Sequence, residues 1–302
     1  MNQAHVPKIR RRRKTWLAIG KYTLAMATAI AILMLLLRLS GLPEAVAFYH
    51  PMPLRGEKPA GAEDVYFTTE DGLRLHGWFI RATTLIAGER GPVVLHSHGN
   101  AGSVAGHSGA TEFLPASGIS VLTFDYRSFG RSQQSSRPLG RDALARDTHA
   151  AYEYLLTRAD VDPDRIGTIG ISLGGAFASS LTANVPQIRA CCLVSAFSGW
   201  QEVAFDHAKT LGRNLIGAGL DPIDSVRAIG KRPVMVVHGD RDSVVPYRHG
   251  KQLVQAAQEA GNEAVFERVQ GASHNNVLST SPTTKPAIVK FFVDALRKRD
   301  NK

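Results

Sequence analysis

Short apolar runs alternate with longer amphipathic stretches along most of the chain beyond residue 90. The runs have the length of buried strands, and the stretches between them place apolar residues at helical spacing. This alternation is typical of a mostly parallel sheet with helices on both faces, so the pattern predicts the α/β fold class. The predicted strands are 93–95, 121–124, 166–169, 191–194, 234–237 and 265–269, and the clearest helices are 141–156, 249–260 and 288–296.

The segment before this alternation has a different pattern. Residues 65–68 and 73–80 are rich in apolar and aromatic side chains and flank Asp71 and Gly72. Because Asp-Gly favours a tight hairpin turn, we expect the folded domain to open with antiparallel strands.

The N-terminal forty residues form a third region. Residues 16–37 carry a single charge, at Lys21, and residues 24–37 carry none. A helix of about 20 apolar residues spans a bilayer, so the pattern predicts a transmembrane signal anchor. We expect a basic cytoplasmic tail at 1–15, the anchor at 16–38, an irregular tether with four prolines at 39–60, and the catalytic domain at 61–302.

The net charge of +10 is concentrated in this region. Eight basic residues lie between Lys8 and Arg38, and no acidic residue precedes Glu44. Basic residues beside a membrane helix remain in the cytoplasm, which predicts a domain on the extracytoplasmic side, periplasmic or lumenal. Beyond Arg38 the chain has 28 basic and 26 acidic residues, so we expect no nucleic-acid partner.

A cleaved signal peptide is the alternative to an anchor. Ala45-Val46-Ala47 offers small residues for cleavage, but it lies about ten residues beyond the apolar run, which is late for a processing site. Paired arginines before Trp16 leave a twin-arginine export signal as a further alternative. The two cysteines, Cys191 and Cys192, are adjacent in an apolar run and are expected to be buried thiols.

Residues 170–174 read Gly-Ile-Ser-Leu-Gly, directly after a predicted strand and directly before a helical stretch. A serine becomes a nucleophile when a sharp turn exposes it beside a base and beside donors for an oxyanion. Reactive groups of parallel sheets gather at the carboxyl ends of the strands. The polar residues at four predicted strand ends are His98 with Asn100, Ser172, Asp240 with Asp242, and His274.

These positions suggest chemical roles. Ser172 is the candidate nucleophile and His274, after the last strand, the candidate base, in the chain order used with this turn. Asp242 is preferred to Asp240 as the acid because the loop must extend past its strand to reach the histidine. Leu173 and Asn100 are the candidate oxyanion donors through their backbone N–H groups, with Ala101 as the alternative to Asn100.

Five segments resemble, in order, the landmarks of the α/β-hydrolase superfamily. They are His98-Gly99-Asn100, residues 125–132, residues 170–174, residues 238–242 and residues 271–274. The closest likeness is to its membrane-anchored serine hydrolases with little or no lid domain, over about residues 65–296. In that family the Asp125-Tyr126-Arg127 segment is structural, and Ser128 stands where a glycine is common.

The resemblance implies hydrolysis of carboxylic ester, thioester or acyl-lipid bonds through a Ser-His-Asp triad and an acyl-enzyme. Small-molecule or lipid esters are therefore the expected substrates, with no cofactor and no metal. A peptidase or amidase, or an inactive binding protein of this fold, remains an alternative. A metal hydrolase built on His96, His98 and His107 would lack acidic ligands in the same loop.

Residues 195–233 separate two predicted strands and offer a small helical cap, an apolar wall for an acyl chain, or ordinary core packing. The apolar residues that fit each of these readings are Trp200, Phe205, Leu211, Leu215 and Ile216.

Overall fold

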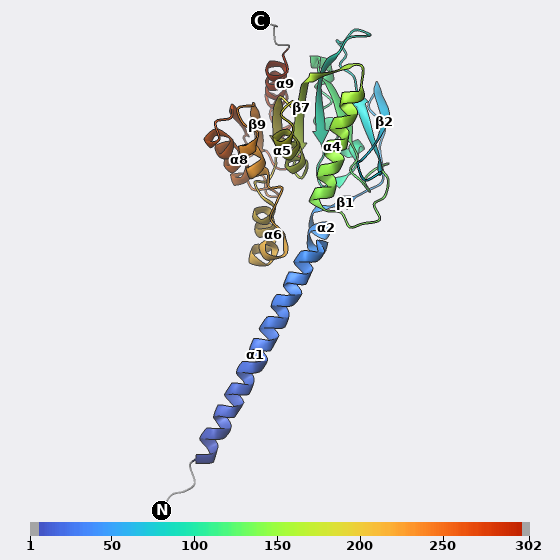
Figure 1. Cartoon of the computed structure of the whole chain (residues 1–302). Helices are drawn as coiled ribbons and strands as arrows, with labels where there is room; N and C mark the ends of the chain where they lie inside the picture. Colours follow the sequence, from blue (N-terminus) through green and yellow to red (C-terminus); the bar gives the residue numbers. More distant parts are fainter. Residues whose placement is uncertain (1–5, 298–302) are drawn as a thin grey trace, which may run out of the picture.

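The computed structural model describes residues 6–297, without the side chains of residues 6–15, 17 and 18. The first five residues of the expected tail and the last five of the expected domain lie outside the described part. The described chain forms a long N-terminal helix and an α/β domain at one end of it (Figure 1).

An eight-stranded sheet forms the centre of the domain, in the order β10-β9-β8-β7-β4-β6-β3-β2. In this sheet, β3 runs in the opposite direction to the other seven strands, so its pairings with β2 and β6 are antiparallel and the rest are parallel. The hairpin expected around Asp71 and Gly72 joins β2 to β3, and the fold class is confirmed. The strands are β2 Ala62–Thr68, β3 Arg74–Ile80, β4 Gly91–Ser97, β6 Ser120–Phe124, β7 Val161–Ile171, β8 Ala190–Val194, β9 Val234–Gly239 and β10 Ala264–Val269.

Helices cover both faces of the sheet. Since side chains alternate across a strand, Val93 and Leu95 of β4 pack on one face, in the cluster that holds helices α4 and α5. Val94 packs on the other face with Phe292 of α9. The helices are α3 Val104–His107, α4 Arg141–Thr157, α5 Gly174–Asn184, α6 Trp200–Leu215, α7 Pro222–Ala228, α8 Arg248–Glu259 and α9 Thr284–Ala295, with 3₁₀ turns at Ser108–Ala110 and Pro115–Ser117.

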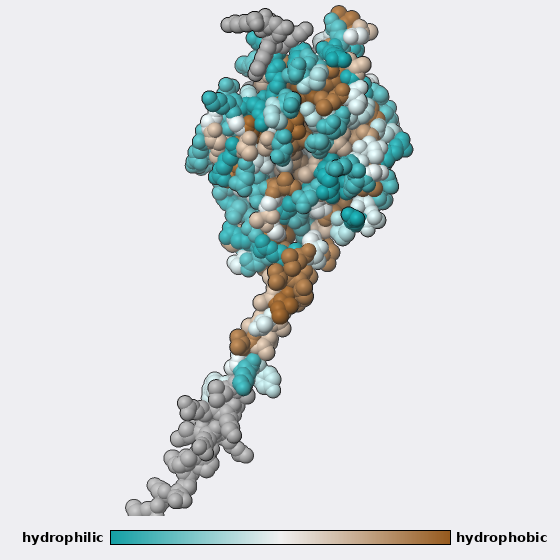
Figure 2. Space-filling model, in the orientation of Figure 1, coloured by the Kyte–Doolittle hydropathy of each residue, from teal (hydrophilic) through white to brown (hydrophobic). Residues whose placement is uncertain are grey.

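Helix α1, Val6–Ser40, leaves the domain beside α6 (Figure 1). Its residues Ile19–Ser40 are long and apolar enough to cross a membrane, and none of this stretch is buried in the protein. The part of α1 nearest the domain has an apolar surface (Figure 2). By length and composition, this helix fits either a membrane anchor or a signal sequence.

The segment after α1 is not the irregular tether that its prolines suggested. It contains helix α2, Leu42–Phe48, and strand β1, His50–Pro51, which pairs in parallel with β5, Ala101–Gly102. Pro43 is compatible with α2 because it lies in the first turn, where an N–H would have no helical partner. Tyr49 is buried in the main core, so this segment belongs to the domain.

The region 195–233 adds two helices, α6 and α7, and α6 lies at the end of the domain from which α1 leaves (Figure 1). Trp200 and Ile216 are buried in the main core, whereas Leu211 is 56% exposed. Helix α6 is kinked at Ala208 and Lys209, and Lys209 has a φ of 53°. Core packing therefore accounts for Trp200 and Ile216, and the second half of α6 lies on the surface.

Candidate functional site

Ser172 lies on a sharp turn between β7 and α5. Its φ is 52°, in the left-handed region, and its N–H donates to the carbonyl of Val194 at 2.8 Å. Both glycines of the motif lie so close to neighbouring backbone atoms that a side chain would not fit at either position. A Cβ on Gly170 would lie 2.4 Å from the carbonyl oxygen of Gly174, and one on Gly174 would lie 2.0 Å from that of Ser97.

The structure brings together Ser172, His274 and Asp242. His274 Nε2 is 3.0 Å from Ser172 Oγ, and its Nδ1 is 2.8 Å from Asp242 Oδ2. A carboxylate can only accept, so Nδ1 carries the proton and Nε2 is left to accept from the serine hydroxyl. The arrangement has the connectivity that activates a serine nucleophile.

Backbone amides fix the carboxylate. Asp242 Oδ1 accepts from the N–H groups of Val244 at 2.9 Å and Val245 at 2.8 Å, while Oδ2 faces the histidine. Burial alone would raise the pKa of Asp242, but hydrogen bonds from His274 and from the Val245 N–H, together with the electrostatic attraction of the neighbouring imidazoles, outweigh burial and lower this pKa. Asp242 therefore remains ionised beside His274.

Asp240, the alternative acid, contacts Arg268 and the turn before His274. Its carboxylate pairs with Arg268 at 2.8 Å and accepts from the N–H of Gly271 at 2.7 Å. These contacts hold the turn that precedes His274, so Asp240 supports the loop without touching the imidazole.

Both predicted oxyanion donors lie beside the serine in the described structure. Among the described residues, nothing accepts a hydrogen bond from the backbone N–H of Leu173 or of Asn100. Asn100, Ser172 and His274 line one hollow of about 700 Å³. Apolar side chains form much of its wall, among them Ile171, Val194, Val244, Val277 and Leu278, and Lys285 also reaches it.

The three histidines near the site have no arrangement for a metal ion. No group of three or more His, Cys, Asp or Glu residues in the described part of the chain could hold one. His98 Nδ1 donates to the carbonyl of Gly99, and His107 Nε2 donates to that of Ala101. Burial lowers the pKa of His96 and of His98 to about 3, so both rings are neutral.

The Asp125-Tyr126-Arg127 segment makes structural contacts. Asp125 pairs with His76 at 2.8 Å, and Arg127 pairs with Asp147 at 2.7 Å. Ser128 has a φ of 69°, so a serine occupies the left-handed position where a glycine is common.

Sequence reasoning missed two features close to the site. His50 of β1 contacts Asn100, with Nδ1 3.0 Å from Oδ1, and nothing in the sequence pattern marked it.

The second feature is another chain of contacts from a serine through a histidine to an aspartate. Ser198 Oγ is 2.8 Å from His249 Nδ1, and His249 Nε2 is 2.7 Å from Asp206. Ser198 is buried, and the contact between Asp206 of α6 and His249 of α8 holds these two helices together.

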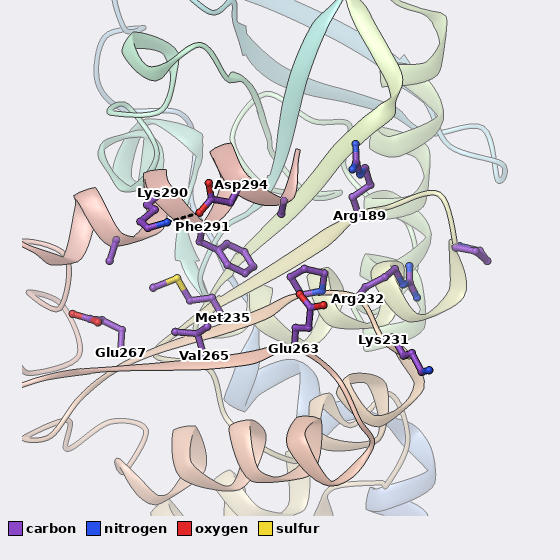
Figure 3. A pocket seen from close by; sticks show the side chains of 14 residues that line it. Arg189, Lys231, Arg232, Met235, Glu263, Val265, Glu267, Lys290, Phe291 and Asp294 are labelled. Atoms are coloured by element: carbon purple, nitrogen blue, oxygen red, sulfur yellow. Dashed lines mark hydrogen bonds and ion pairs between the residues drawn. The ribbon is translucent and has the colours of Figure 1, made fainter. Parts of the chain in front are cut away.

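Another hollow of about 700 Å³ lies at the opposite ends of the strands, between α9 and the starts of β9 and β10 (Figure 3). Met235, Val265 and Phe291 form its apolar floor, and Lys290 pairs with Asp294 at its rim. None of the predicted site residues lines it.

Sequence comparison places the chain among known proteins. The prolyl oligopeptidase family matches residues 133–299. The uncharacterized protein Rv2307c of Mycobacterium tuberculosis is 37% identical over 229 residues, which cover 75% of this chain and 77% of that protein. The uncharacterized protein YfhR of Escherichia coli K12 is 33% identical over 215 residues, covering 70% and 74%.

Solved structures share the fold. The Pyrococcus furiosus esterase Pf2001 superimposes with a TM-score of 0.69 at 21% identity, over 83% of this chain and 99% of the esterase. The acylaminoacyl peptidase of Pyrococcus horikoshii superimposes with a TM-score of 0.60 at 17% identity, over 80% of this chain and 42% of the peptidase.

Proposed function

The chain belongs to the prolyl oligopeptidase family of α/β-hydrolases, and from this premise we propose that it is a serine hydrolase acting on carboxylic esters, thioesters or acyl lipids. The observation that carries the proposal is the continuous contact from Ser172 Oγ through His274 to Asp242. The left-handed conformation of Ser172 costs free energy, and such strain is typical of functional sites. The aligned triad at this strained serine therefore supports catalysis over binding alone.

The proposed reaction is acyl transfer in two steps. His274 Nε2 takes the proton of Ser172 as Oγ bonds to the substrate carbonyl carbon, and the N–H groups of Leu173 and Asn100 stabilise the oxyanion. The tetrahedral intermediate then expels the alcohol or thiol, which receives the proton from His274. Water, deprotonated by the same imidazole, then attacks the acyl carbon. The bond from that carbon to Ser172 Oγ breaks, Oγ takes the proton back from His274, and the acid is released. Asp242 stabilises the imidazolium in both steps.

One observation supports an ester over a peptide. The hollow beside Ser172 has an apolar wall suited to an acyl chain.

A peptidase or amidase is the second candidate. The family that matches is named for an oligopeptidase, and acylaminoacyl peptidase shares the fold. The same triad would serve either bond, since peptide hydrolysis differs in its leaving group.

We also propose that α1 anchors the enzyme, with the N-terminus in the cytoplasm and the domain outside it, near membrane-borne substrates. Packing supports an uncleaved segment: Glu44 of α2, which is partly buried, pairs with the buried Arg141 at 2.5 Å. Cleavage after Ala47 would remove that carboxylate from a buried guanidinium. The mature chain is expected to retain residues before Glu44; a mature N-terminus near Phe48 would contradict the anchor.

The catalytic proposal is tested by turnover of p-nitrophenyl esters of increasing chain length, monoacylglycerols and aminoacyl amides. We expect the purified full-length chain to cleave esters fastest and Ser172→Ala to lose about 10⁶ in kcat. Ser198→Ala is the matched control because Ser198 also contacts a histidine, and it should retain activity. Near-normal turnover by Ser172→Ala would contradict the mechanism, and faster cleavage of amides would favour the peptidase.

A further inference from the structure

The segment that joins α1 to the domain reaches the candidate oxyanion loop. Strand β1 pairs with β5 in the register His50 to Ala101 and Pro51 to Gly102. On its other side, Met52 accepts from the N–H of Gly130 at 2.9 Å. The segment after α2 therefore lies between the loop that follows β4 and the loop that follows β6.

The loop from His98 to Gly102 is held by its carbonyl groups, each of which accepts a hydrogen bond. The donors to these five carbonyls, in order, are Tyr126 Oη at 3.1 Å, His98 Nδ1 at 2.8 Å, His50 N at 3.4 Å, His107 Nε2 at 2.6 Å and Met52 N at 3.3 Å. Two of the five donors come from the segment after α2.

These contacts control the direction of the Asn100 N–H. In a trans peptide the carbonyl and the N–H point in opposite directions, so fixing the Gly99 carbonyl orients the N–H of Asn100. His50 fixes the other side of Asn100 at two points: its N–H bonds the Asn100 carbonyl, and its ring Nδ1 is 3.0 Å from Asn100 Oδ1.

The start of this segment is itself held firmly. Tyr49, directly before His50, is buried, and its hydroxyl donates to Glu44 at 2.7 Å. Phe48 packs edge-on against Trp200 at 5.1 Å between ring centroids. His50 is exposed, so its contact with Asn100 is not a by-product of burial.

We propose that His50 is a positioning residue for the oxyanion site, which holds Asn100 so that its N–H points at the developing oxyanion. This inference rests on the proposed function. It makes the junction between the membrane helix and the domain a part of the catalytic apparatus, acting through Asn100 without touching the substrate.

The test compares variants of the full-length chain in detergent, with kcat measured per active site titrated by a phosphonate. Removing an oxyanion donor costs about 10²–10³ in rate, and a misdirected donor a fraction of that. We expect His50→Ala to lower kcat about tenfold with KM within about twofold. His50→Asn places an amide where Nδ1 stands and should restore kcat to within about threefold of the unmodified chain.

A mutant cycle with Asn100→Ala isolates the contact. Because either substitution breaks the same hydrogen bond, the double variant should be no slower than the slower single variant. His149→Ala is the control for loss of an exposed histidine: its ion-pair partner is Glu153 of the same helix, and kcat should not change.

Two results would overturn the inference and leave the proposed function standing: an unchanged kcat in His50→Ala, or single losses that multiply in the double variant. A loss of thermal stability with unchanged kcat would assign His50 a structural role alone. An unmodified chain that neither cleaves esters nor reacts at Ser172 would instead contradict the proposed function, and the inference with it.

Discussion

Ser172 has a backbone conformation that serine seldom adopts, and its surroundings impose that conformation. With φ at 52°, the residue is held between β7 and a helix that packs directly against the β4 strand end. Strain of this kind costs about 1–3 kcal/mol and persists where packing over-determines it. The two flanking glycines are the residues that permit such packing.

Gly174→Ala tests that packing. The added Cβ would lie 2.0 Å from the carbonyl oxygen of Ser97, a backbone atom that cannot move independently. We expect the free energy of unfolding to fall by more than about 3 kcal/mol. Denaturant unfolding followed by the fluorescence of the buried Trp78 and Trp200 measures it.

Gly106→Ala is the matched control for Gly174→Ala. Gly106 lies in helix α3, where an added Cβ meets no atom within 4 Å. Alanine should there be neutral or stabilising by about 0.5 kcal/mol. Equal stabilities of the two variants would show that close approach at Gly174 does not constrain the turn.

At the residue scale, the sequence could predict the candidate catalytic residues that lie directly after a strand. Ser172, Asp242 and His274 each follow a predicted strand, so topology brings them to one edge of the sheet. His50 could not be predicted in this way because it follows no predicted strand. Its place depends on how α2 docks, which is a property of packing.

Helix α2 is the element that departs most from expectation. Prolines and a short apolar pattern suggested an irregular tether, yet contacts with α4 and α6 pack α2 against the core. Seven residues are too few to reveal helical periodicity, and the stabilising partner, Arg141, is 97 residues away. The six parallel strands β4 and β6 to β10, and helices α4, α8 and α9, carried their own pattern and were predicted from it, whereas helix α6 was left open.

Glu44→Ala tests the docking of α2. Removing Glu44 leaves the buried charge of Arg141 uncompensated, so we expect a loss of about 3 kcal/mol in the free energy of unfolding. The exposed pair between Glu202 and Arg213 provides the control, since Glu202→Ala should cost less than about 1 kcal/mol. Similar losses in both variants would contradict a structural role for α2.

The same ion pair predicts a pH dependence. Burial alone would raise the pKa of Glu44, but hydrogen bonds from Arg141 and Tyr49 outweigh it and lower this pKa below 4.5. The unfolded chain therefore binds the proton more readily, and the stabilisation is lost as the pH falls from about 4.5 through the folded-state pKa. The difference in stability between the unmodified chain and Glu44→Ala should shrink over that range.

At the scale of the whole molecule, charge and hydropathy divide the chain into an N-terminal helix and an α/β domain. The positive charge lies on the N-terminal arm and the domain is nearly neutral. Helix α1 leaves the domain beside α6 (Figure 1), and the segment that follows α1 pairs with the loop that lines the hollow beside Ser172. The proposed anchor and the proposed active site are thus neighbours, which favours substrates presented at a membrane.

The sequence could predict the division into an N-terminal helix and a domain, but not that the end of this helix lies near the proposed active site. Apolar length and charge asymmetry are local patterns, and they mark α1 as a candidate span. The pairing of β1 with β5 joins residues about fifty positions apart, and two-residue strands leave no periodic signal.

Covalent labelling of Ser172 is the most direct test of the central claim. A fluorophosphonate reacts by forming a bond from the serine oxygen to phosphorus as fluoride leaves, which requires an activated hydroxyl. Peptide mass spectrometry of the labelled full-length chain should find one adduct, on the peptide that contains Ser172. The adduct should persist in Ser198→Ala and disappear in Ser172→Ala. A folded chain with no adduct on Ser172, or with the adduct on Ser198, would contradict the assignment of Ser172 as the nucleophile.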